Sequence, residues 1–163
     1  MSQETIKEMT VAEFDQFWPT FEAVIKVQET YAFEPNMSQD QARQIWCELP
    51  LKTFVYIEEG KVLGSYYIKP NAVGPGSHVC NCGYMVSPQA RGKGIAKQMC
   101  EHSQQQALEL GFKAMQFNSV VSTNEVAVKL WKKLGFDIVG TLPKAYQHGK
   151  FGLVDCYVMY KWL

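Results

Sequence analysis

Apolar residues along the chain switch between two spacings, alternation at every second position and recurrence every three or four positions. The first spacing is typical of strands and the second of amphipathic helices. The expected strands cover residues 6–9, 52–58, 62–69, 78–86, 114–120, 136–142 and 154–162. The expected helices cover residues 11–28, 38–48 and 123–134, together with a long helix that starts in the stretch 89–96 and ends at Leu110.

Local signals refine several boundaries. The segments 10–13 and 38–41 each have the Ser/Thr-x-x-Glu/Gln pattern of a capping box, which predicts a helix start at both places. Pro19 lies inside the first helical pattern and predicts a kink or a break near Trp18. Residues 143–153 are mostly polar and are expected to form a loop between the last two strands.

The order of these elements predicts the fold class. Helices and strands alternate in the second half of the chain, and neither internal repeats nor a linker interrupt the pattern. We expect one domain over residues 1–163, of the α/β (α+β) class, with a mixed central sheet of about seven strands and helices on both faces. Strands 78–86 and 114–120 flank the long helix and should be parallel, with a right-handed connection.

The most informative stretch for function is Gln89-Ala90-Arg91-Gly92-Lys93-Gly94-Ile95-Ala96, which lies between an expected strand and the long helix. Glycines allow a ligand to approach the backbone closely, and the first N–H groups of a helix attract negative charge. Arg91 and Lys93 add positive charge at the same place. The stretch therefore predicts a phosphate site, with pyrophosphate favoured. It lacks the Gly-Lys-Ser/Thr ending of an ATP-binding loop and the third glycine of a dinucleotide fingerprint.

Composition narrows the function classes. The 163 residues include 16 basic and 16 acidic side chains, so no charge excess suggests binding to nucleic acid or to a membrane surface. Residues 1–10 lack the features of a signal peptide, and the five cysteines are expected to be reduced thiols of a cytoplasmic protein. Cys80 and Cys82 have no second Cys or His pair with ligand spacing, so we expect no metal.

Two motifs together resemble one known family. The stretch 89–96 fits the Gln/Arg-x-x-Gly-x-Gly/Ala loop of the GCN5-related N-acetyltransferases. Residues 124–136 are similar to that family's Asn-x-x-Ala-x-x-Leu-Tyr-x-x-x-Gly-Phe segment. The resemblance covers about the last two thirds of the chain by motif, and the first third by element order.

The resemblance implies acetyl-CoA as the donor and an amine as the acceptor. In the family, the strand before the glycine turn and the next parallel strand splay apart, and the pantetheine arm lies between them. Met85 and Val86 would offer backbone groups to that arm, and Asn124 would contact it. The pyrophosphate would be held by Gln89, Arg91, Gly92, Lys93, Gly94, Ile95 and Ala96.

The sequence departs from the family at two points. Trp131 replaces a Tyr that often protonates the leaving thiolate, and an indole N–H does not serve as an acid. We interpret Trp131 as a core residue. The strand 78–86 lacks the carboxylate that often acts as base, and His78 is either an alternative base or a residue of the site's rim.

Asparagines mark the expected acceptor site. Asn81 and Asn118 lie on the two splayed strands and together could bind a substrate carboxylate, which predicts an amino-acid-like acceptor. A strand interior disfavours Asn, so Asn118 suggests a functional role. The run 117–124 with Asn81 resembles the branch that acetylates azetidine-2-carboxylate and other proline analogues, which implies catalytic roles for Asn118 and Asn124. Tyr31 is a further candidate substrate contact.

Other functions remain open. The acceptor could instead be a polyamine, an antibiotic or a protein N-terminus, and a non-catalytic acyl-CoA-binding module is a further alternative. A polyamine site would need acidic walls, which the expected site strands lack. A homodimer through the last strands is also open, with Tyr157, Tyr160 and Trp162 as candidate contacts that would otherwise belong to the domain's own core and edge.

Overall fold

The computed structural model describes residues 3–163, which form a seven-stranded sheet in the order β1-β2-β3-β4-β5-β7-β6. The strands are β1 (Glu4–Glu8), β2 (Lys52–Glu58), β3 (Lys61–Pro70), β4 (Val79–Val86), β5 (Ala114–Val121), β6 (Asp137–His148) and β7 (Gly152–Trp162). The helices are α1 (Val11–Lys26), α2 (Gln39–Arg43), α3 (Ile95–Glu109) and α4 (Glu125–Lys133), with the short turns η1 (Gln44–Glu48), η2 (Gly74–Gly76) and η3 (Pro88–Ala90). This architecture confirms the expected fold class.

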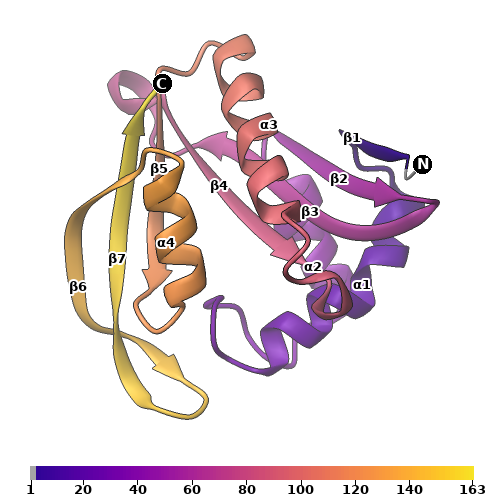
Figure 1. Cartoon of the computed structure of the whole chain (residues 1–163), viewed down its shortest axis with the longest axis horizontal. Coiled ribbons are helices and arrows are strands. Elements are labelled where there is room, and N and C mark those ends of the chain that lie inside the picture. The colour runs from indigo at the N-terminus through magenta and orange to yellow at the C-terminus, as the bar shows by residue number, and fades with distance from the viewer. Residues whose placement is uncertain (1–2) are drawn as a thin grey trace.

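Helices cover both faces of the sheet (Figure 1). α3 and α4 lie in front of the sheet in this view, and α1 and α2 lie behind it. On the front face, Met99 of α3 and Trp131 of α4 belong to one buried apolar cluster, which we call the front core. On the rear face, Phe17 of α1 and Trp46 of η1 belong to a second cluster, which we call the rear core. Burial of these two apolar layers is the main force that holds the helices to the sheet.

Both expected capping boxes are present. Thr10 accepts the N–H of Glu13 while the Glu13 carboxylate accepts the Thr10 N–H, and the pair Ser38 and Gln41 does the same. Of the kink or break predicted near Trp18, the break is wrong, because α1 continues through Pro19 to Lys26. The second helix differs from the expectation as well, since it changes from an α-helix to the π-helix η1 after Arg43.

The expected loop 143–153 is wrong. β6 runs to His148 and β7 begins at Gly152, so only a short turn separates two long antiparallel strands. Tyr146 and His148 are buried between exposed neighbours, which is a strand alternation that the polar composition concealed. The pairing register shifts between Leu142 and Tyr146, where the Lys144 N–H donates to Asp155 at 2.9 Å.

The parallel strands β4 and β5 stay together for only part of their length. Each has eight residues, but they pair at three positions, from Val79 with Ala114 to Asn81 with Gln116. Beyond that point they diverge, as Figure 1 shows towards the lower edge of the sheet. We call the place where the pairing ends, beside Asn81 and Gln116, the vertex. Among residues 3–163, the backbone of β4 beyond the vertex has no strand partner on its β5 side.

Several cysteines lie in the core. All five are free, and Cys80 and Cys82 are both buried in the front core, as expected for structural thiols. Within residues 3–163, no group of three or more His, Cys, Asp or Glu side chains is placed to hold a metal ion. Across the same described range, every helix is too short or too polar to cross a membrane.

The contact between Trp46 and Ser65 fixes η1 on the sheet. The indole N–H of Trp46 donates to Ser65 Oγ at 2.8 Å, and that hydroxyl donates to the Phe54 carbonyl at 2.6 Å. Ser65→Ala would leave the buried indole N–H without an acceptor, so we expect it to lower the free energy of unfolding by about 1–3 kcal/mol. Urea denaturation measures this change. The exposed Ser119→Ala is the control, and equal stability of both variants would contradict the prediction.

Candidate active site

The glycine turn before α3 leaves its backbone open. Gly92 and Gly94 have φ values of +82° and +77°, and a Cβ added at either would meet nothing within 4 Å. Gly94 is the N-cap of α3, where no side chain caps the helix and no acidic residue lies in the first turn. Free N–H groups and the helix dipole therefore favour an anion in the open space over the turn.

Side chains around the turn divide into anchors and exposed groups. Ala90 and Ile95 are buried in the front core and hold the turn against the sheet. Arg91 and Lys93 are exposed on the same loop. The Gln89 side chain accepts a hydrogen bond from Ser87 Oγ at 2.7 Å. Of the expected phosphate contacts, Ile95 can thus offer only its backbone, while Arg91 and Lys93 can offer charge.

The open edge of β4 follows the vertex. Met85 and Val86 pair with β3 on one side, and their side chains are directed into opposite cores. Beyond the vertex the Tyr84 carbonyl accepts the Tyr31 hydroxyl at 2.7 Å, so a side chain and not a strand bonds to the backbone there. A ligand arm that lay along this edge would meet backbone groups that no strand of the described chain occupies.

Asn81 lies at the vertex but is used within the protein. Its Oδ1 accepts the Tyr67 hydroxyl at 3.0 Å, and its Nδ2 donates to the Gln116 carbonyl at 2.9 Å. The side chain is also buried, with 5% of the residue exposed. Asn81 therefore bridges β4 and β5 and helps to end their pairing, which points to a positioning role more than to direct contact with an acceptor.

Asn118 is exposed and lies two residues beyond Gln116, the last residue of β5 that pairs with β4. It lies where the β5–β7 register shifts between Phe117 and Val120, and such bulges re-aim side chains. Its Oδ1 accepts from Gln116 Nε2 at 2.9 Å, and its Nδ2 donates to Asn71 Oδ1 at 2.7 Å. Sequence reasoning missed Gln116 and Asn71, although the i, i+2 spacing of Gln116 and Asn118 places both on one face of β5.

Tyr31 links the loop between α1 and α2 to the vertex. Its ring stacks on Phe33 with centroids 5.5 Å apart, and its backbone carbonyl accepts the Tyr146 hydroxyl at 3.0 Å. Burial raises the pKa of Tyr31 well above its usual value, and burial raises that of Tyr67 to about 12. Both phenols therefore stay protonated at neutral pH and act as hydrogen-bond donors.

A cavity of about 190 Å³ opens beside Tyr31, between the α1–α2 loop and the β6–β7 hairpin. Its lining residues are Gln28, Tyr31, Ala32, Phe33, Ala145, Tyr146 and Gln147. The Gly149 N–H donates to the Gln28 carbonyl at 2.8 Å and fastens the hairpin to the loop. The cavity is open to the surface and approaches the vertex through Tyr31, whose hydroxyl bonds to the Tyr84 carbonyl of β4.

Comparison with known proteins identifies the family to which the chain belongs. The Acetyltransferase (GNAT) family matches residues 14–136. The chain belongs to this family. N-acetyltransferase aca1 of Schizosaccharomyces pombe is 31% identical over 151 residues, which span 82% of this chain and 72% of that protein.

Solved structures agree with the family assignment. A GCN5-related N-acetyltransferase from Kribbella flavida superposes with a TM-score of 0.93 at 39% identity, over 98% of each chain. YncA from Salmonella typhimurium, solved with its cofactor acetyl-CoA, has a TM-score of 0.82 at 20% identity over 99% of this chain and 94% of that one. The latter likeness concerns the fold alone. As a GNAT acetyltransferase, the protein is an acyltransferase.

The remaining expected GNAT residues occupy different environments. Trp131 is 8% exposed and packs against Tyr84 and Phe117, which confirms its interpretation as a core residue. Asn124 is half-buried as the N-cap of α4, where its Oδ1 accepts the Ala127 N–H at 3.3 Å. His78 is exposed before the start of β4, at the opposite end of the strand from Val86.

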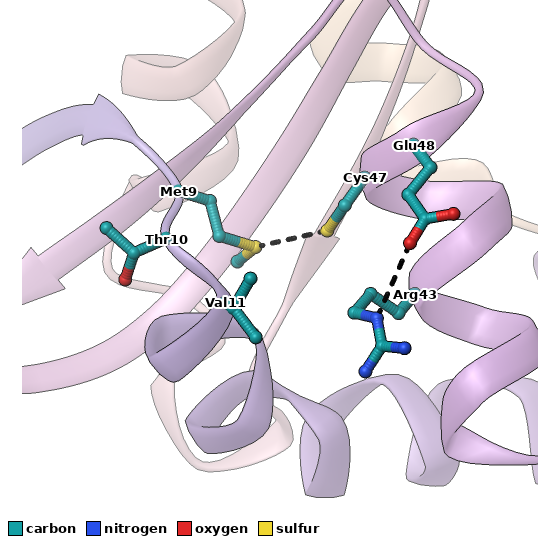
Figure 2. Close-up of a pocket in the computed structure, with 6 residues that line it drawn as sticks. All are labelled: Met9, Thr10, Val11, Arg43, Cys47 and Glu48. Carbon is teal, nitrogen blue, oxygen red and sulfur yellow. Dashed lines mark hydrogen bonds and ion pairs between the residues drawn. The ribbon is translucent and has the colours of Figure 1, made fainter.

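A second cavity lies away from the GNAT vertex (Figure 2). It has a volume of about 240 Å³ and is lined by Met9, Thr10, Val11, Arg43, Cys47 and Glu48. Burial raises the pKa of the Cys47 thiol to about 11, so this thiol is protonated at neutral pH. Arg43 is already paired with Glu48 at 3.6 Å. The cavity therefore presents neither a reactive thiolate nor an unpaired arginine.

The raised pKa of Tyr31 predicts how stability depends on alkaline pH. The unfolded phenol ionises from about pH 10, whereas the folded phenol ionises only at higher pH, so unfolding releases a proton and stability falls as pH rises above 10. Each such phenol contributes a slope that approaches about 1.4 kcal/mol per pH unit once the unfolded phenol is fully ionised, and that averages about half of this between pH 9 and 11. Tyr31→Phe should therefore make the decline in this range less steep by about 0.7 kcal/mol per pH unit. Denaturant titrations between pH 9 and 11 measure the slope, and an unchanged slope would contradict the pKa assignment.

Proposed function

We propose that this GNAT enzyme transfers the acetyl group of acetyl-CoA to the nitrogen of a small, amino-acid-like acceptor such as a proline analogue. The observation that carries the proposal is the cluster of neutral amides beside the vertex, made by Asn71, Gln116 and Asn118. Amide N–H groups can donate hydrogen bonds to a carboxylate, and because they are uncharged they leave the neighbouring amine free to stay neutral. The acceptor would stand next to the open edge of β4, where the donor's thioester is proposed to lie.

The donor would bind along the glycine turn and the open edge of β4. The proposed pyrophosphate contacts are Gln89, Arg91, Gly92, Lys93, Gly94, Ile95 and Ala96, and the free backbone and the two cations of this turn support them. Met85 and Val86 would pair with the pantetheine arm through their backbone. Asn124 would reach the arm from the start of α4 through its side-chain N–H groups, because its Oδ1 is used as a helix cap.

The proposed reaction is a direct transfer. The acceptor's nitrogen attacks the thioester carbonyl carbon, the C–S bond breaks, the nitrogen loses one proton, and the sulfur leaves as a thiolate that takes one proton from water. Tyr31 and Tyr67 cannot remove the proton, because their pKa values lie above the working range. Asn118 and Asn124 would orient the reacting groups by donating hydrogen bonds, and the acceptor would enter as a neutral amine.

The architecture around the vertex supports a small acceptor. Tyr31 closes the site from the α1–α2 loop, and its contact with Tyr146 draws the β6–β7 hairpin over the same place. These contacts place the β6–β7 hairpin beside the proposed site and limit the width available to an extended peptide. A proline analogue of the azetidine-2-carboxylate type would combine the required nitrogen and carboxylate in a molecule that the neighbouring cavity of about 190 Å³ can accommodate.

The cellular setting and assembly follow as further parts of the proposal. All five cysteines are free, which suits the reducing cytoplasm. A homodimer through the last strands would use Trp162, which is 62% exposed, and Tyr160. Tyr157 instead packs against the front core, so its contribution to such a contact would be smaller.

Gly92→Asp tests the donor site. The carboxylate would add negative charge and bulk in the open space over the turn, so we expect acetyl-CoA affinity to fall at least tenfold by titration calorimetry. Gly60→Asp is the matched control, because Gly60 has a φ of +77° and is equally open but lies in the β2–β3 turn. Unchanged affinity in Gly92→Asp, with Gly60→Asp also unchanged, would remove the pyrophosphate assignment.

An acceptor panel tests the reaction itself. Thiol release from acetyl-CoA would be followed with azetidine-2-carboxylate, proline analogues, primary amino acids, spermidine and a short peptide. We expect turnover with the cyclic imino acids, because they pair an amine with an adjacent carboxylate. Turnover confined to spermidine or peptide would overturn the proposed acceptor, and tight CoA binding without any turnover would support a non-catalytic acyl-CoA-binding module.

A further inference from the structure

Lys69 of β3 stands in one row with two residues of the vertex. It pairs in register with Asn81 of β4, which in turn pairs with Gln116 of β5. Directly paired residues present their side chains on the same face of a sheet, and two strand spacings amount to roughly 10 Å. A lysine side chain on β3 can therefore reach towards a ligand held over Gln116 and Asn118.

The Lys69 side chain already leans towards the vertex. Its Nζ lies 5.3 Å from the ring centroid of Tyr67, whose hydroxyl bonds to Asn81. Within residues 3–163, Lys69 forms no ion pair with an acidic side chain. Lys69 is half-buried as a residue, and a ring face attracts a cation without neutralising it, so the ammonium can still attract an anion.

The amides beside Lys69 have spare donors and no carboxylate among their bonded partners. Each primary amide carries two N–H groups. Gln116 uses one on Asn118, and Asn118 uses one on Asn71, so each retains an N–H for a ligand. Spare amide N–H groups on β5 and a lysine on β3 in the same row would suit one carboxylate held between them, since its charge would meet a positive one and its oxygens would meet donors.

We propose that Lys69 binds the carboxylate of the acceptor and thereby selects amino and imino acids over polyamines. This inference rests on the proposed function and names its substrate class: an α-carboxylate next to the reacting nitrogen. The carboxylate lies between Lys69 and the amides of Gln116 and Asn118, and the nitrogen lies towards the Tyr84 carbonyl and the open edge of β4. A polyamine is rejected because its second ammonium group would face Lys69.

The test compares acids with their carboxamides in wild type and variants. Azetidine-2-carboxylate and its carboxamide form one pair, and proline and prolinamide form the other. Lys69→Gln should raise the KM of the acid about tenfold or more, with little change for the carboxamide or for acetyl-CoA, because a hydrogen bond to a charged group is lost. Lys69→Arg should keep most of the acid's kcat/KM. The control is Lys61→Gln, an exposed lysine at the far end of β3.

The outcomes separate this inference from the proposed function. If wild type acetylates acids and carboxamides equally and Lys69→Gln changes neither KM, the role of Lys69 is overturned while small-amine acetylation stands. If wild type turns over only spermidine, both the acceptor class and the role of Lys69 are overturned. Melting temperatures of all variants show whether folding is intact. A loss in Lys69→Gln that Lys69→Arg restores, for the acids alone, supports the charge role.

Discussion

The separation of β4 and β5 is the constraint on which the rest of the site depends. Two parallel strands of eight residues would ordinarily continue their pairing, yet they part after three pairs. Trp131 of α4 lies 5.1 Å from both Tyr84 and Phe117 by ring centroids, so one side chain packs against both diverging strands from the front. At the rear, Asn81 bridges to the Gln116 carbonyl and fixes where pairing ends. The Trp131 indole thus contributes packing at the position where the resemblance would imply an acidic Tyr.

The sequence predicted what local chemistry determines. Capping boxes, the glycine turn and the order of elements depend on short patterns, and all of them are present. Both strands of the β6–β7 hairpin were expected, but their extension into residues 143–153 was missed, because the buried positions there carry Tyr146 and His148, polar aromatics that compositional reasoning assigns to loops. Their burial depends on the α1–α2 loop, more than a hundred residues earlier in the chain, as the bond between Tyr146 and the Tyr31 carbonyl shows. Long-range contacts of this kind leave no local signal.

The two asparagines of the expected site show the same limit. Both stood out as amides in strands, but only the structure distinguishes them. Asn81 satisfies its oxygen and one N–H with protein partners in a buried place, whereas Asn118 is exposed at a register shift with an N–H to spare. Which amide faces solvent depends on where β4 and β5 separate and on where β5 bulges against β7. The partners Gln116 and Asn71 could not be chosen from sequence, since an amide gains its role from its neighbours.

Charge at the vertex connects the fold to the choice of acceptor. The phenols of Tyr31 and Tyr67 stay neutral because burial disfavours their anions, and the neighbouring amides are neutral by nature. Among these neutral groups the proposed role of the Lys69 ammonium is to supply the positive charge, since the hydrogen bonds of the Gln116–Asn118–Asn71 amides within residues 3–163 involve no acidic side chain. Lys69 occupies that position by strand register, in line with Asn81 and Gln116. Under the proposed function, such a site would favour an acceptor that carries no net positive charge once its amine is neutral. An amino acid meets this condition through its carboxylate, and a polyamine does not.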